Sequence, residues 1–114
     1  MIDPIPFFYN DVAAPLAAHA SLLLLPQAVE AFAATTQHDG CAEFRVTYVV
    51  CDDDKALSVE YQKQAIEVCR SRESRLGGRD GVEVVEMQSG HSPFLSQTEE
   101  MARVLLRAAG VRKY

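Results

Sequence analysis

Two groups of residues have side chains that could perform acid–base chemistry. One is the acidic triplet Asp52-Asp53-Asp54, and the other is His91 in the segment GHSPFLS. A carboxylate that accepts a hydrogen bond from one imidazole nitrogen fixes the histidine tautomer and leaves the second nitrogen as a general base. The spacing alone also allows a simple ion pair or a capped loop, so both interpretations stay open at this point.

Two strands are expected to position these residues. Residues 45–51 read RVTYVVC, a β-branched and aromatic run that is typical of a strand buried on both faces. Residues 82–87 form a second predicted strand. The triplet follows the first strand and His91 follows the second, and α/β proteins bind ligands outside the carboxyl ends of parallel strands. If the strands are neighbours, a carboxylate and the imidazole meet on the same rim.

A helix is predicted after each strand. The first covers residues 58–70, and its inward face is expected to consist of Tyr61, Ala65, Val68 and Cys69. The last helix begins at a capping box formed by Ser96 and Glu99 and ends at Gly110. Its inward face is expected to consist of Met101, Val104, Leu105 and Ala108. The order strand, helix, strand, helix is that of one right-handed parallel unit.

The residues before the first strand favour helix rather than sheet. Residues 1–11 are rich in proline and aromatic side chains, which predicts an extended lead-in. Alanine and leucine dominate residues 12–34, where Pro15 suits the first turn of a helix. Pro26 ends that helix and opens a second one near residues 27–34.

The composition is that of an ordinary globular chain. The 114 residues are 48% apolar and 24% charged, the net charge is −5, and no apolar run is long enough to span a membrane. An acidic chain of this kind binds nucleic-acid backbones poorly, and the basic residues within 70–79 are interpreted as a solvated loop. The first residues lack the basic region of a secretory signal. We therefore expect a cytoplasmic protein that binds neither nucleic acid nor membrane.

The three cysteines predict neither a disulfide nor a metal site. Cys41, Cys51 and Cys69 are an odd number without a CxxC pair, which favours reduced thiols. His38 and Cys41 have a metal-ligand spacing without further ligands, and the acidic triplet lacks the glycine and the last acid of a calcium loop. We expect no metal and no cofactor. Cys51 is interpreted as a small apolar residue, with a nucleophilic role as the less favoured alternative.

Two longer runs resemble a known family. TYVVCDDDKALSVEYQKQAIE, followed by VVEMQSGHSPFLSQTEEMARVLLRAAG, resembles the carboxyl-terminal part of an α/β-hydrolase, in the branch of the methylesterases and hydroxynitrile lyases. FYNDV and LLPQAVEAF are similar to the end of that family's helical cap. The resemblance implies an α/β fold with two parallel strands, a helical cap-like remnant in residues 1–40, and the carboxyl-terminal part of the hydrolase core in residues 41–114. It places the family's orienting aspartate on Asp54, rather than on the two preceding aspartates, and its catalytic histidine on His91.

The serine nucleophile of the family has no counterpart in this sequence. α/β-Hydrolases carry that serine before the aspartate and the histidine, on a G-x-S-x-G turn, and the 114 residues contain no such motif. Ser89, Ser92 and Ser96 are expected to be loop or capping hydroxyls. The resemblance therefore implies an esterase-type serine hydrolase portion with the Asp-His part of a triad, inactive alone. It would act on a small ester-like substrate only if another polypeptide supplied the serine.

Two further interpretations stay open. A sheet of only two strands leaves strand edges bare, and bare edges favour association. The chain is thus also consistent with a non-catalytic interaction module that forms a homo-oligomer or pairs with a complementing hydrolase chain. A truncated gene product is the remaining alternative.

Overall fold

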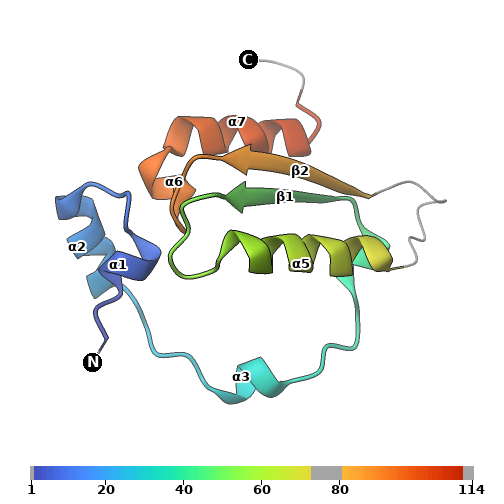
Figure 1. Cartoon of the computed structure of the whole chain (residues 1–114), viewed down its shortest axis with the longest axis horizontal. Helices are drawn as coiled ribbons and strands as arrows, with labels where there is room; N and C mark the ends of the chain where they lie inside the picture. Colours follow the sequence, from blue (N-terminus) through green and yellow to red (C-terminus); the bar gives the residue numbers. More distant parts are fainter. Residues whose placement is uncertain (1, 73–80, 112–114) are drawn as a thin grey trace.

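A parallel pair of strands forms the sheet of this protein, whose computed structural model describes residues 2–72 and 81–111. β1 (Val46–Cys51) and β2 (Val82–Met87) pair with the first residue of one opposite the first of the other, and the last opposite the last. The two predicted strands and their parallel direction are therefore confirmed. Because both strands end at the same edge, the loops that follow them leave the sheet side by side (Figure 1).

Helix α5 (Val59–Ser71) joins the two strands, and Figure 1 shows it on the opposite side of them from α7. It begins at Ser58, whose hydroxyl accepts a hydrogen bond from the backbone N–H of Tyr61 at 3.3 Å. Its buried residues are Gln62, Ile66 and Cys69. The predicted inward face is wrong for Tyr61 and Val68, which are 59% and 53% exposed. A hydropathy pattern does not assign the polar Gln62 to the core, although this residue lies on the inner face of the first turn.

Helix α7 (Thr98–Ala108) follows the short helix α6 (Pro93–Ser96). The predicted capping box is wrong, because Ser96 belongs to α6 and its hydroxyl donates to the backbone carbonyl of Ser92 at 3.4 Å. The predicted end at Gly110 is confirmed. This glycine has φ +76°, the left-handed conformation that glycine adopts without a steric penalty.

The first two helices lie beyond the carboxyl ends of both strands (Figure 1). The predicted extended lead-in over residues 1–11 is wrong where α1 (Ile5–Phe8) forms, because Pro6 lies in its first turn, where proline is compatible with a helix. Helix α2 (Ala14–Leu22) contains Pro15 in its first turn, as predicted. A small core holds these helices together and consists of Tyr9, Val12 and Ala17.

Two further single-turn helices lie between α2 and the sheet. α3 (Glu30–Ala33) is shorter than predicted and lies on an exposed arch of chain between α2 and the sheet (Figure 1). α4 (Gly40–Glu43) has no signal in the hydropathy pattern. It is capped by Asp39, whose carboxylate accepts a hydrogen bond from the backbone N–H of Cys41 at 2.9 Å.

A disulfide joins Cys41 to Cys69, and the Cα atoms of the two residues are 5.5 Å apart. The prediction of reduced thiols is wrong for this pair. α4 places Cys41 against the last turn of α5, a proximity that a sequence separation of 28 residues does not reveal. The third cysteine, Cys51, is free and buried.

The main core lies between α5 and one face of the sheet, and its buried members are Val50, Ile66, Cys69 and Val82. On the side of α7, both strands and the helix line an open groove of about 640 Å3. No helix within residues 2–72 and 81–111 is long and apolar enough to cross a membrane. Of the basic residues predicted to form a solvated loop, Arg75 and Arg79 lie outside the described ranges.

Candidate functional site

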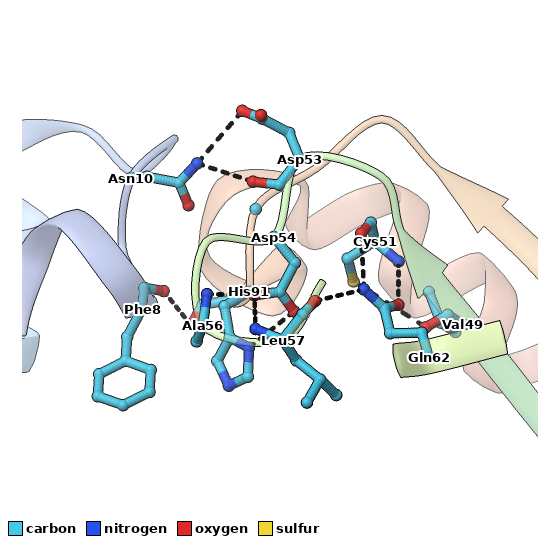
Figure 2. Close-up of polar contacts among 12 residues, drawn as sticks. Phe8, Asn10, Val49, Cys51, Asp53, Asp54, Ala56, Leu57, Gln62 and His91 are labelled. Carbon is cyan, nitrogen blue, oxygen red and sulfur yellow. Dashed lines mark hydrogen bonds and ion pairs between the residues drawn. The ribbon is translucent and has the colours of Figure 1, made fainter. Parts of the chain in front are cut away.

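Asp54 and His91 are in direct contact at the carboxyl edge of the sheet. The Oδ2 atom of Asp54 lies 2.8 Å from Nδ1 of His91 (Figure 2). The Asp54 side chain is 5% exposed and the His91 side chain is 36% exposed. An ionised carboxylate only accepts hydrogen bonds, so Nδ1 carries the proton and Nε2 carries the lone pair when the imidazole is neutral. The expected meeting of a carboxylate with the imidazole is therefore confirmed.

The loop after β1 holds the Asp54 carboxylate in one orientation. Its Oδ1 atom accepts hydrogen bonds from the backbone N–H groups of Ala56 and Leu57, at 2.8 and 2.9 Å (Figure 2). Such a local turn around an aspartate closes readily because the side chain reaches the N–H groups two and three residues ahead. One carboxylate oxygen is thus engaged by the backbone, and the other is directed at the imidazole.

The two preceding aspartates have different partners. Asp52 accepts a hydrogen bond from the backbone N–H of Ser89 at 3.1 Å, which connects the two loops of the site. Asp53 pairs with Lys55 at 2.7 Å, and both of these side chains are more than half exposed. The structure therefore brings the third aspartate of the triplet to the imidazole. The first two bond to other groups around the site.

Gln62 supports the site, and sequence analysis missed it. Its Oε1 accepts a hydrogen bond from the backbone N–H of Cys51 at 2.9 Å, and its Nε2 donates to the carbonyls of Cys51 and Leu57 at 2.9 and 2.8 Å (Figure 2). The residue is 1% exposed. It fixes both ends of the Asp54 loop to α5. A polar residue on the inner face of an amphipathic helix, four positions before Ile66, is the signal that could have found it.

The accessible part of His91 is the side away from Asp54. Among the described residues, no group forms a hydrogen bond with Nε2. The Phe8 ring lies beside the imidazole, with the ring centroids 5.2 Å apart and the planes inclined at 51°. Nε2 is therefore available to a proton donor that this part of the chain does not itself provide.

The hydroxyls of Ser92 and Ser96 and the thiol of Cys51 are not poised as nucleophiles. Ser92 is 2% exposed and donates to the Phe8 carbonyl at 2.7 Å, and Ser96 donates to a backbone carbonyl as well. Burial raises the pKa of the Cys51 thiol, and the neighbouring carboxylates, Asp54 first among them, raise that pKa further. A nucleophilic cysteine needs a lowered pKa, so Cys51 behaves as the small buried residue that the sequence predicts.

The possible metal ligands are dispersed. Cys41 is bonded to Cys69, and His38 is 84% exposed with Glu43 as its neighbour at 3.9 Å. Within the described ranges, no three side chains of His, Cys, Asp or Glu are grouped as they would be around a metal ion.

Similarity to two fungal proteins extends over most of the chain. The chain is 28% identical over 102 residues to the α/β hydrolase nvfD of Aspergillus novofumigatus, and 26% identical over 106 residues to a Phoma protein named "Probable hydrolase R7". These similarities support a relationship of the chain to the α/β-hydrolase superfamily. They cover 90% and 93% of this chain, which spans only 37% and 41% of the length of the two relatives. No protein-family model matches the sequence.

Proposed function

We propose that Asp54 and His91 are the orienting acid and the general base of an α/β-hydrolase-type site, whose serine nucleophile comes from a segment outside these 114 residues. The observation that supports this most is the 2.8 Å contact between a nearly buried carboxylate and an imidazole with an available Nε2. The similarity to two fungal proteins named as hydrolases supports the same reaction class.

In the proposed reaction, Nε2 of His91 removes the proton of the serine hydroxyl as its oxygen attacks a carbonyl carbon. The imidazolium that forms is stabilised by Asp54, and it then gives its proton to the leaving group. A water molecule, deprotonated in the same way by His91, then attacks the acyl-enzyme, and the serine leaves with the proton as the acid is released. A small ester, amide or lactone is the substrate class that fits this chemistry.

On this proposal, the 114-residue chain alone is inactive. Acid–base assistance contributes on the order of 10²- to 10⁴-fold, whereas donors that stabilise the oxyanion contribute a larger share. The G-x-S-x-G turn that supplies the serine and one such donor is absent from the sequence. The missing groups would therefore come from the remaining length of a hydrolase, either in the same polypeptide or in a complementing chain.

The finer assignments rest on the sequence motifs alone. We propose the methylesterase and hydroxynitrile lyase-like branch, with residues 1–40 as a cap-like part and residues 41–114 as the end of the core. The cytoplasmic location stays a prediction, and the Cys41–Cys69 bond weighs against it because disulfides are rare in reducing compartments.

The test is a chimera in which this chain replaces the matching segment of the nvfD hydrolase. We expect a fluorophosphonate probe to label the serine of the chimera, and we expect labelling to be lost when His91→Gln is introduced. The 114-residue chain alone should neither be labelled nor hydrolyse p-nitrophenyl acetate. Labelling that is unaffected by His91→Gln, or labelling of a serine in the isolated chain, would contradict the proposal.

As a second proposal, the chain is a non-catalytic interaction module. The strand edges and the groove beside α7 favour this function. Within the described ranges each strand has a single hydrogen-bonded neighbour, and the groove beside α7 is lined partly by Val46, Val49 and Leu105. Unpaired strand edges next to apolar side chains favour pairing with another chain. Light scattering during size-exclusion chromatography should then show a dimer or larger species, and a stable monomer at high concentration would refute this proposal.

A further inference from the structure

Residues 8–11, which are the last residue of α1 and the turn that follows it, touch both loops of the candidate site; we refer to them as the 8–11 turn. On the side of the first loop, Nδ2 of Asn10 donates to the backbone carbonyl of Asp53 at 3.0 Å and to its carboxylate at 3.2 Å (Figure 2). Asp53 directly precedes Asp54. The turn therefore anchors the backbone from which the orienting carboxylate extends.

The same turn holds both neighbours of His91. Asp11 accepts a hydrogen bond from the backbone N–H of Gly90 at 2.8 Å, and the Phe8 carbonyl accepts one from the Ser92 hydroxyl at 2.7 Å. Gly90 and Ser92 are buried, so water cannot readily replace these partners. The Phe8 ring also lies against the imidazole. His91 is thus fixed on both sides along the backbone and on one face of its ring.

The fit between the turn and the second loop leaves no room for a side chain at position 90. A Cβ atom on Gly90 would collide with Oδ1 of Asn10 and would lie 2.6 Å from Oδ1 of Asp11. Gly90 therefore allows the Asn10 and Asp11 side chains to approach the second loop this closely.

The two loops also bond directly to each other, through Asp52 to the Ser89 N–H and through the Asp53 N–H to the Ser89 carbonyl. These bonds continue the pairing of the strands, and they bring the loops together without the turn. What the turn adds is the orientation of the residues on either side of the Asp54–His91 contact.

We propose that Asn10 and Asp11 are positioning residues, which keep the Asp54 carboxylate on Nδ1 of His91 and so keep Nε2 free as the base. Phe8 limits the rotation of the imidazole in this arrangement. The inference rests on the proposed acid–base role of the pair, and it extends the site to a segment almost eighty residues away in the sequence.

The experiment is nuclear magnetic resonance of the full chain labelled with 15N in its histidines, at a pH where the imidazoles are neutral. The ring nitrogen shifts report which nitrogen carries the proton, and a spectrum of His91→Gln assigns the signals. In the unmodified protein we expect the His91 proton on Nδ1. Asn10→Ala and Asp11→Ala should give a mixture of tautomers and at least a severalfold faster exchange of the Nδ1 proton with water.

Asp11→Asn should restore the original spectrum, because its amide oxygen can still accept the bond from Gly90. Asp3→Ala is the matched control. Asp3 accepts a hydrogen bond from the backbone N–H of Ile5 at the start of α1 and has no bond to either loop. A residue that only stabilised the fold would change the melting temperature without changing the proton distribution on His91.

Two outcomes would overturn the inference, and they are distinguishable. If Asp54→Asn changes the His91 tautomer but the folded Asn10→Ala and Asp11→Ala variants do not, the positioning role is wrong and the acid–base pair stands. If Asp54→Asn changes nothing either, both the pair and the positioning role are wrong. Should Asp11→Ala fail to fold, Asn10→Ala carries the same test.

Discussion

Replacing Gln62 by leucine should destabilise the protein strongly, because this side chain makes three hydrogen bonds in a site that excludes water. Leucine has a similar volume, so the change removes the bonds without opening a large cavity. The N–H and carbonyl of Cys51 become buried groups without partners, and the Leu57 carbonyl, which is partly buried, loses one. At about 1 kcal/mol for each bond, the three lost bonds amount to about 3 kcal/mol, and the penalty for unsatisfied buried groups makes this a lower bound on the expected loss.

A loss of that size is a large fraction of the stability of a small domain, so urea unfolding followed by circular dichroism will resolve it. Gln64→Leu is the matched control, since Gln64 is exposed on the same helix, and its free energy of unfolding should change by less than about 0.5 kcal/mol. The reasoning would be refuted if Gln62→Leu were as stable as Gln64→Leu.

Three more predictions concern the thiols, the pH and the close approach at the second loop. Titration with Ellman's reagent should find one thiol, Cys51, in the unfolded unreduced protein and three after reduction; three before reduction would contradict the disulfide. Burial raises the pKa of Cys51 and of Tyr48 above their ordinary values of 9.0 and 10.0, so folding favours their neutral forms. These two groups should therefore lower the free energy of unfolding as the pH rises above 9, and pH-dependent unfolding will show this fall. Cys51→Ala should reduce the fall, and stability that rose above pH 9 would be the wrong sign. Gly90→Ala should lower the free energy of unfolding by about 2 kcal/mol in urea unfolding, whereas Gly81→Ala, whose nearest contact would be at 3.9 Å, should change it little; equal effects would contradict the steric argument.

The strands and the acid–histidine contact could be predicted because each depends on local signals. A β-branched run indicates a strand wherever it packs, and the residue after such a strand lies at the sheet edge by geometry alone. Once the strands pair in parallel, the acidic triplet and His91 lie at the same edge, and the resemblance to the α/β-hydrolases singled out Asp54 within the triplet.

The features that sequence analysis missed depend on tertiary contacts. The disulfide needs α4, a single turn whose position follows from the cap at Asp39 rather than from hydropathy. Ser96 has the spacing of a helix cap, but the preceding Pro93 starts a separate turn that includes it. The 8–11 turn reaches the site only because α1 lies beyond the ends of both strands. Sequence spacing does not report such approaches between distant segments.

The most direct test of the acid–base account is the rate of fluorophosphonate labelling in the nvfD chimera with Asp54→Asn, compared with Asp53→Asn. Asparagine at position 54 can offer its amide nitrogen to the imidazole and so stabilise the wrong tautomer, which in a serine–histidine–aspartate triad lowers the rate by about 10⁴-fold. We predict a loss of that order for Asp54→Asn and a change of less than about tenfold for Asp53→Asn, whose side chain pairs with Lys55 rather than His91. Equal labelling rates for the two variants would contradict the account.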